Sequence, residues 1–395
     1  MNERVPLARG LPVASGADAA RQRVVINGRF LGRRVTGVER YAIEIVRAID
    51  TLIAEGHPLA VRFRFSLAVP GDAEFDAPLH AVRVERVGLW PPRLWTLSSR
   101  LWEQLALPYW SGRDPILNFC NTAPVLSPRN VTCLHDANVW LVPRNYSLGF
   151  RLLYRLLLPL SVRRSRRWMT VSRFSGEQLH GFGVADRPPE AITPCGADHA
   201  LRWSSVRSSL DPARLPVRYV LALGSRSLNK NFALAHELAG HLAAKGIRVV
   251  TAGGDNSKVF GRPAASRSSE VIALGRVSDD DLALLYERAT AFLFPSLYEG
   301  FGLPPVEAMQ FGCPVVASNT TSMPEVLGDA ALLCDPAVIG EWAAAVDRLA
   351  SDAALRQELI RRGRERAAGF TWRRSALAVL RMVDEITAPS AGTAV

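Results

Sequence analysis

Two glutamates beside a glycine-rich turn are the residues of this sequence best placed to do chemistry. In the stretch "SLYEGFGLPPVEAM", Glu299 and Glu307 stand eight positions apart, with two glycines and two prolines between them. A carboxylate offers two acceptor oxygens, which suits a pair of vicinal hydroxyls such as those of a ribose or a hexose. Surface or helix-capping glutamates are the alternative interpretation.

The turn between the two glutamates predicts an anion site. The apolar run "AFLFP" before it reads as a strand, and the proline pair suits the first turn of a helix. Gly300 and Gly302 permit backbone conformations that are closed to other residues. Phe301, Gly302 and Leu303 would then present amide groups at a helix N-terminus, where anions such as phosphate bind.

A second glycine loop, "LALGSRSLNKNF", carries two cations between a predicted strand and a predicted helix. Arg226 and Lys230 could both reach a phosphate across a cleft, although an ordinary solvated cation pair is the alternative. The loop matches no Walker A pattern, and neither glycine region fits G-x-G-x-x-G. Together with the glutamate turn, it suggests a diphosphate held between lysine, arginine and amides.

The N-terminal half offers two further polar loops. "GRRVTGVERY" places Gly32 and Gly37 between a predicted strand and a predicted helix, with arginines flanking the turn. His135 and Asp136 follow the strand-like run "NVTCL", where a parallel sheet makes its ligand contacts. A satisfied loop histidine is the alternative interpretation of His135.

Elements that would position these loops alternate as strand and helix in two blocks. "RVVINGRFL" and "RYVLALG" read as strands, whereas "GVERYAIEIVRAIDTLIAEG" and "NFALAHELAGHLAAKG" have helical spacing. Residues 150–167 are predicted as a further helix, and Ser278 with Asp281 predicts a capping box. The pattern predicts an α/β fold of two Rossmann-like, doubly wound parallel-sheet domains facing an interdomain cleft.

The expected domain boundaries follow from the same pattern. We expect a disordered tail over residues 1–21, an N-terminal domain over 22–196, a linker without clear periodicity over 197–216, a C-terminal domain over 217–372, and a last helix and tail over 373–395.

Composition limits the class of protein. The chain has 395 residues, 48% of them hydrophobic, and no apolar window long enough to span a membrane. Five cysteines without metal-ligand spacing predict reduced thiols in the cytosol. The net charge is +11, but no nucleic-acid-binding motif accompanies it, so we expect no nucleic-acid partner.

A cluster of arginines could bind a membrane surface, and the sequence alone does not decide this. Arg163, Arg164, Arg166 and Arg167 follow a leucine-rich segment. They could lie on an anionic membrane surface, or they could form a solvated helix end.

Taken together, these motifs resemble the family-4 retaining glycosyltransferases of the GT-B fold, from about Val24 to Trp372. The clearest element is "PSLYEGFGLPPVEAM", which contains the family's E-x7-E motif as Glu299 and Glu307. Also similar are "TGVERYAIEI", "HDANVW", "TVSRFSGEQL", "ITPCGAD", "LGRVSDDDLALLYERA" and "GCPVVASNTTSMPEVLGDAALLCDP".

The resemblance implies a sugar-nucleotide donor lying in the cleft, mostly against the second domain. Glu307 would hold the ribose hydroxyls and Glu299 would face the donor sugar. Arg226 and Lys230 would bind the pyrophosphate, together with the amides of the Phe301–Leu303 turn. Where the family often has Pro-Arg-Lys-Asn, this chain has Leu-Asn-Lys-Asn, so Arg226 is the candidate for the missing arginine.

On the first domain, the resemblance implies that Gly37 lets its loop approach the phosphates. His135 would sit near the transferred sugar and the acceptor, with Asp136 on the acceptor side. Glu325 is assigned to structure, and the last segment, about 373–386, would cross back to the first domain.

The implied activity is that of a retaining hexosyltransferase that needs no metal or other cofactor. GDP-mannose is the first candidate donor, and a lipid-linked or oligosaccharide acceptor would belong to exopolysaccharide, O-antigen or lipopolysaccharide biosynthesis. A UDP-hexose or dTDP-rhamnose donor stays open, as do a sugar phosphorylase or synthase on the same fold and a non-catalytic binding protein. We expect a cytoplasmic protein, with a peripheral position on the inner membrane as a further hypothesis.

Overall fold

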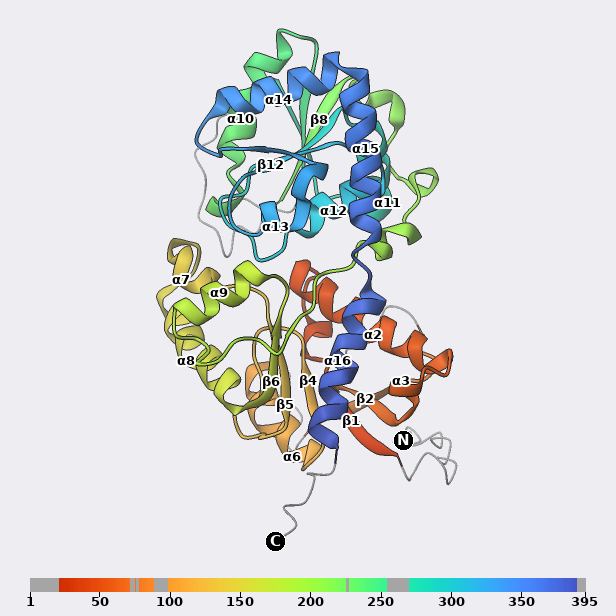
Figure 1. Cartoon of the computed structure of the whole chain (residues 1–395), viewed down its shortest axis with the longest axis vertical. Helices are drawn as coiled ribbons and strands as arrows, with labels where there is room; N and C mark the ends of the chain where they lie inside the picture. Colours follow the sequence, from red (N-terminus) through yellow and green to blue (C-terminus); the bar gives the residue numbers. More distant parts are fainter. Residues whose placement is uncertain are drawn as a thin grey trace, which may run out of the picture.

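The computed structural model describes residues 21–71, 75, 78–88, 99–224, 227–253 and 270–388. Of the predicted N-terminal tail only Arg21 is described, and Arg226 lies outside these residues. The described chain forms two α/β domains, the first below the second in Figure 1, each built on a parallel sheet. The predicted fold class is thereby confirmed.

The first sheet joins the strands of the N-terminal half. Within the described residues it has seven parallel strands, in the order β3 (Arg83–Val87), β2 (Phe63–Pro70), β1 (Gln22–Asn27), β4 (Ile116–Asn118), β5 (Asn130–Leu134), β6 (Ser165–Thr170) and β7 (Ala191–Ile192). β4 and β5 are buried at every position, as expected where helices cover both faces of a parallel sheet.

Helices and short turns connect these strands. The α-helices are α2 (Gly37–Ala54), α3 (Pro58–Val61), α5 (Ser99–Leu101), α6 (Leu107–Ser111), α7 (Asn138–Leu141), α8 (Leu148–Arg164) and α9 (Arg173–Gly181). A π-helical turn covers Trp102–Ala106, and 3-10 turns cover Arg29–Gly32 and Pro143–Asn145. α2 begins with a capping box of Thr36 and Glu39 and buries Tyr41, Ile45 and Ile49.

The second sheet is built in the same way. Its six described strands lie parallel in the order β10 (Val271–Gly275), β9 (Arg248–Ala252), β8 (Tyr219–Leu223), β11 (Ala291–Phe294), β12 (Val315–Ser318) and β13 (Leu332–Cys334). Its helices are α10 (Phe232–Ala243), α11 (Asp279–Arg288), α12 (Leu303–Gln310), α13 (Met323–Leu327), α14 (Ile339–Ser351) and α15 (Ala353–Ala368), with 3-10 turns η7 (Leu228–Lys230) and η8 (Gly328–Ala330). The predicted capping box of Ser278 and Asp281 at the start of α11 is confirmed.

Two segments run between the domains. The first contains three 3-10 turns, η4 (Asp198–Arg202), η5 (Ser205–Arg207) and η6 (Pro212–Arg214). The second is α16 (Trp372–Thr387), which leaves the second domain and runs down the first domain in Figure 1, packed on α2. Arg62 and Arg167 of the first domain form ion pairs with acidic residues of α16.

The predicted helix over residues 150–167 is wrong at its C-terminal end. α8 ends at Arg164, and the following residues form β6, in which Trp168 and Met169 are fully buried against β5. Consecutive arginines at the start of β6 lack the alternation of a half-buried strand, and they therefore resembled an exposed helix end. Arg166 and Arg167 consequently belong to the sheet.

Each sheet has a switch point, which is a pair of neighbouring strands whose outgoing connections run in opposite directions along the sheet. In the first sheet it lies between β1 and β4, and in the second between β8 and β11. Loops at the carboxyl ends of such strands diverge and leave room for a ligand. The residues predicted to do chemistry follow β1, β5, β8 and β11, so the topology gathers them at two facing sheet edges.

Candidate active site

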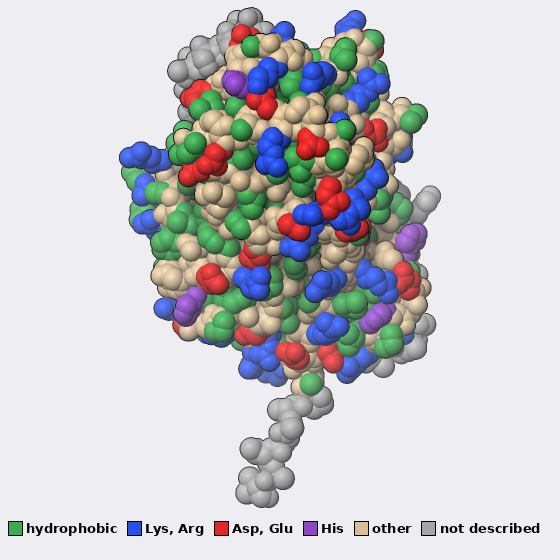
Figure 2. Space-filling view, turned by 45° about the horizontal axis from the view of Figure 1, so that its top comes forward, with side chains coloured by type: hydrophobic (Ala, Val, Ile, Leu, Met, Phe, Trp, Pro, Cys, Tyr) green, Lys and Arg blue, Asp and Glu red, His purple; other side chains and the backbone are tan. Residues whose placement is uncertain are grey.

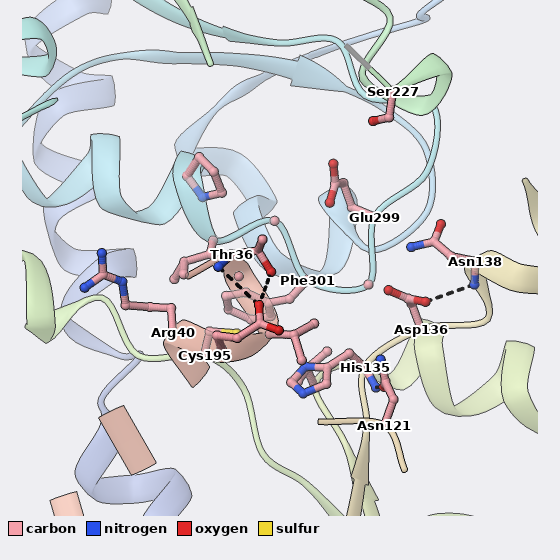
Figure 3. Close-up of a pocket in the computed structure, with 18 of the residues that line it drawn as sticks. Thr36, Arg40, Asn121, His135, Asp136, Asn138, Cys195, Ser227, Glu299 and Phe301 are labelled. Atoms are coloured by element: carbon pink, nitrogen blue, oxygen red, sulfur yellow. Dashed lines mark hydrogen bonds between the residues drawn. The ribbon is translucent and has the colours of Figure 1, made fainter. Parts of the chain in front are cut away.

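A cavity of about 570 Å³ lies between the carboxyl ends of the two sheets. Nine of the predicted site residues line it, namely Gly37, His135, Asp136, Lys230, Glu299, Phe301, Gly302, Leu303 and Glu307. Figure 3 shows Glu299 of the second domain and Asp136 of the first domain at the same cavity. Arg226 cannot be placed, because it is not among the described residues.

Lys230 and Glu299 form an ion pair on the second-domain wall. Lys230 Nζ lies 2.5 Å from Glu299 Oε1, and both side chains remain partly exposed to the cavity. The ammonium also lies 5.2 Å from the centre of the Phe294 ring. Each charged group therefore has a partner in this structure while staying within reach of a ligand.

The backbone around this ion pair is held in uncommon conformations. Asn231, next to Lys230, and Thr321 both have positive φ angles, 49° and 58°. Thr321 Oγ1 accepts a hydrogen bond from the Glu299 amide at 3.3 Å, and Ser322 Oγ donates to the Glu299 carbonyl at 3.1 Å. Positive φ in residues other than glycine is concentrated at functional sites, where the surroundings hold it in place.

The turn after Glu299 requires glycine at two positions. A Cβ at Gly300 would collide with the carbonyl oxygen of His135, and a Cβ at Gly302 would collide with Met323. Gly302 also has a φ of 87°, which favours glycine. The Gly300 carbonyl accepts hydrogen bonds from the hydroxyls of Ser172 and Ser175, at 2.5 and 3.0 Å. These hydrogen bonds hold the turn directly against the first domain.

Free amide groups follow this turn. α12 begins at Leu303, directly after its N-cap Gly302. Among the described residues, the amides of Phe301, Gly302 and Leu303 have no hydrogen-bond partner. Three unpaired donors at a helix N-terminus, all lining the cavity, have the arrangement that typically binds anions.

Glu307 is buried one turn inside α12 and is held by a histidine that the sequence analysis did not single out. Its Oε1 lies 2.9 Å from Nε2 of His199, which is fully buried in η4. Residues 197–216 were predicted to be a linker, so His199 had no assigned function. No periodicity in this segment marks His199, and only the folded structure shows that it is buried together with Cys195, Ala197 and Ala200.

His135 is buried on the first-domain wall, and its hydrogen bonds define its protonation. Nε2 lies 2.7 Å from the carbonyl oxygen of Phe119, which can only accept, so Nε2 carries the proton. Burial lowers the pKa of His135, which favours the neutral ring. Nδ1 is then a hydrogen-bond acceptor. The His135 amide donates to Asn121 Oδ1 at 2.7 Å, and Asn121 itself has a φ of 67°.

Asp136 completes this wall. Its Oδ1 accepts a hydrogen bond from the Asn138 amide at 3.0 Å (Figure 3). Burial raises the pKa of the Asp136 carboxyl, and the negative charge of Glu299 across the cavity raises it further.

The N-terminus of α2 supplies a second set of donors. Gly37 and Val38 are its first residues and line the cavity, and a Cβ at Gly37 would meet no atom within 4 Å. Next to them, both carboxylate oxygens of Asp279 in α11 accept from Arg40 Nη2, at 2.8 and 2.7 Å. This ion pair joins the rims of the two domains.

Two other acidic positions have structural partners. Glu325 accepts hydrogen bonds from the amides of Arg173 and Phe174 at the start of α9, at 2.9 and 3.1 Å, and so caps that helix across the interface. Asp281 is the N3 residue of the capping box that Ser278 begins at the start of α11. Within the described ranges, no three His, Cys, Asp or Glu side chains are grouped to hold a metal ion.

Comparisons with known proteins agree with this geometry. Residues 212–366 match the family model described as Glycosyl transferases group 1. The O-antigen chain mannosyltransferase B of Escherichia coli is 45% identical over 107 residues, which are 27% of this chain and only 28% of that protein. The O-antigen chain mannosyltransferase RfbU of Salmonella typhimurium is 24% identical over 339 residues, which are 82% of this chain and 90% of that protein.

A solved structure extends the likeness to the whole fold. The Anabaena protein Alr3699/HepE in complex with UDP and glucose has a TM-score of 0.65 at 16% identity, covering 92% of this chain and 100% of that one. The two parallel-sheet domains are therefore those of the GT-B fold. Residues 212–366, most of the second domain, match the group 1 glycosyltransferases, in agreement with the resemblance seen in the sequence.

Proposed function

We propose that this chain is a retaining hexosyltransferase that transfers mannose from GDP-mannose to a lipid-linked or oligosaccharide acceptor of a bacterial surface polysaccharide. The observation that carries the proposal is the cavity itself. It combines a cation, free amides and a glutamate pair on one wall with a neutral histidine on the other. The two O-antigen mannosyltransferases among the relatives support mannose as the sugar.

The free amides and Lys230 would bind the diphosphate of the donor. Breaking the bond between the anomeric carbon and the phosphate oxygen leaves a diphosphate with additional negative charge. Preorganised donors stabilise such charge where it develops, which is often the largest catalytic contribution. Phe301, Gly302 and Leu303, together with Gly37 and Val38 at the start of α2, line the same cavity from two domains.

Donor binding would separate Lys230 from Glu299. The ammonium would turn to the diphosphate, and the carboxylate would accept hydrogen bonds from the hydroxyls of the sugar. The ion pair seen here holds the two side chains in position until then. Nδ1 of His135, as an acceptor, would bind another sugar hydroxyl.

Retention of configuration would follow from attack on the face that the diphosphate leaves. The acceptor hydroxyl oxygen bonds to the anomeric carbon, the bond to the phosphate oxygen breaks, and the hydroxyl proton passes to that oxygen. No nucleophilic side chain is required in this scheme. Charge stabilisation by Lys230 and amides also makes a metal ion unnecessary, and full turnover in excess EDTA is the expected result.

A turnover assay tests the proposal. GDP-mannose, UDP-glucose and dTDP-rhamnose are each supplied with a lipid-linked acceptor, and release of the nucleoside diphosphate is followed. We expect GDP-mannose to be used, with NMR of the product showing an α linkage. Glu299→Ala should lower turnover about 100-fold without changing the circular dichroism spectrum. Wild-type turnover in this variant, or a β-linked product, would contradict the proposal.

A UDP-hexose donor is the second candidate, because the similarly folded Alr3699/HepE is described with UDP and glucose. The same assay separates the two donors. Addition of inorganic phosphate to the product tests the alternative of a sugar phosphorylase, since a phosphorylase would release a sugar phosphate and a transferase would not.

We propose that the first domain docks on an anionic membrane surface through α8. In the part of the chain that the structure describes, no helix is long and apolar enough to cross a membrane. α8, on the outer side of the first domain in Figure 1, instead exposes Leu148, Leu152 and Leu156 to 71, 70 and 60%. Arg155 and Arg163 stand seven positions after Leu148 and Leu156, so they share this helix face.

Leucines flanked by arginines suit the boundary between acyl chains and anionic headgroups. Over the face visible in Figure 2, Lys and Arg are interspersed with Asp and Glu. Replacing the three α8 leucines by serine should therefore abolish most sedimentation with phosphatidylglycerol vesicles. Val206, Val217 and Val338, which are also exposed, provide the matched serine control. Equal sedimentation of both triple variants would contradict the docking proposal.

A further inference from the structure

Both ring nitrogens of His199 have a defined partner in the interior of the protein. Nε2 lies 2.9 Å from Oε1 of Glu307, and Nδ1 lies 3.1 Å from Nε1 of Trp372. The ring is fully buried and also packs edge-on against Trp203. These contacts fix the ring's position and both of its polar edges.

The hydrogen bond from Trp372 determines the tautomer of His199. An indole N–H can only donate, so Nδ1 of His199 must accept and cannot carry a proton. The proton of the neutral ring therefore sits on Nε2 and points at Glu307. One carboxylate oxygen of Glu307 is thus fixed, and the described residues provide no partner for the other oxygen at the cavity.

His199 and Trp372 belong to the two segments that run between the domains. Asp198 Oδ1 accepts from the Trp372 amide at 3.0 Å, and the Ala197 amide donates to the Phe370 carbonyl at 2.8 Å. A Cβ at Gly196 would collide with the Trp372 amide nitrogen. Hydrogen bonds therefore join the two segments next to His199, the residue that contacts Glu307.

We propose that His199 is a positioning residue for nucleotide binding. Its Nε2–H orients the Glu307 carboxylate so that the free oxygen faces the ribose hydroxyls, and Trp372 fixes the tautomer that makes this possible. The inference rests on the proposed function, in which Glu307 binds the ribose. A buried histidine that only fills space would affect stability but would not affect recognition of the 2′-hydroxyl.

Calorimetric titration with ribonucleotides and deoxyribonucleotides separates these roles. GDP, UDP and their 2′-deoxy forms are titrated into the full chain and into His199→Phe, which keeps a ring but loses the donor. For wild type we expect at least one ribonucleotide to bind about tenfold more tightly than its deoxy form. In His199→Phe this ratio should fall towards one, mainly through weaker binding of the ribonucleotide.

His199→Gln is the rescue variant, because its amide can accept from Trp372 and donate to Glu307. It should restore most of the ratio, and His199→Asn, whose side chain is shorter, should not. This pair keeps the test decisive if His199→Phe does not fold. An unchanged ratio in His199→Phe, equal losses for both nucleotides, or matching Gln and Asn variants would overturn the inference.

Failure of the proposed function gives a different result. In that case the wild-type protein would bind none of the four nucleotides. Wild-type binding that is lost in Glu307→Ala but unaffected in His199→Phe would leave the proposed function standing and overturn only the role of His199.

Discussion

The second-domain wall of the cavity carries Lys230, Glu299 and Glu307 inside the segment that matches the group 1 family, residues 212–366. The opposite wall, which includes His135, lies outside that segment. The second domain presents Lys230, Glu299 and unpaired amides, whereas in the first domain burial lowers the pKa of His135 and raises that of Asp136, which favours the neutral form of each. The difference suggests a division of work. In the proposed function, the second domain would stabilise the charge of the leaving diphosphate, and the first domain would contribute hydrogen bonds from neutral groups.

The largest effect is expected from the charged wall. Lys230→Ala removes the cation at the proposed diphosphate position and leaves Glu299 without its partner. We expect kcat to fall about 100- to 1,000-fold, as when a charge-stabilising donor is removed. Lys245→Ala is the matched control, because Lys245 pairs with Asp347 on the surface. Similar kcat values for the two variants would break the proposed division of work.

The contact between the walls is tested by Gly300→Ala. The added methyl group would collide with the His135 carbonyl and push the two domains apart. We expect kcat/KM to fall about tenfold or more, together with a lower Tm, since repulsion in a packed interface costs about 1–3 kcal/mol. Gly149→Ala, where a Cβ meets no atom within 4 Å, should match wild type. A fully active Gly300→Ala protein would show that the domains need not close as they do here.

The buried position of His135 on the first-domain wall predicts that the stability of the protein depends on pH. Burial lowers the pKa of His135, so the unfolded chain binds protons more readily than the folded chain just below the ordinary pKa of about 6.5. The stability associated with His135 is therefore present above about pH 6.5 and lost as pH falls below it, by at most about 1.4 kcal/mol per pH unit. Urea unfolding between pH 7.5 and 5 should show a shallower decline for His135→Gln. His80→Gln, at an exposed histidine, should follow the wild-type profile.

The smallest effect is expected at the rim. Arg40 and Asp279 join the domains, but their side chains are 22 and 40% exposed, so solvent screens the pair. Arg40→Ala should change the free energy of unfolding by about 1 kcal/mol or less and KM by about twofold. Asp279→Ala should behave alike, and the double variant should be no worse than either single variant. Additive losses would mean that each residue acts independently of the other.

Much of the fold could be predicted because buried apolar runs alternate with helical periodicity. The segment from α8 to β6 shows the limit. The run that begins at Trp168 and Met169 could be predicted as a strand, but Arg166 and Arg167 before it carry no strand signal, and pairing with β5 extends the strand to include them. The sequence pattern was therefore sufficient where local and tertiary preferences agree, and it failed where they differ.

The candidate site shows the same division. The glutamate turn could be found because strand, glycines, prolines and carboxylates stand close together in the sequence. His199 could not be found from the sequence, because its partner Glu307 lies 108 positions away and the residues around it show no periodicity. The ion pair between Lys230 and Glu299 could not be predicted either, because it depends on the order of β8 and β11 in the sheet.

The central claim is that this cavity binds the nucleotide of a sugar donor through Glu307. Calorimetric titration of GDP, UDP and dTDP into the wild-type chain and Glu307→Ala tests it most directly. We predict selective binding of one nucleoside diphosphate, GDP as the first candidate, and its loss in the variant. No binding to the folded wild-type protein, or equal binding to both proteins, would contradict the claim.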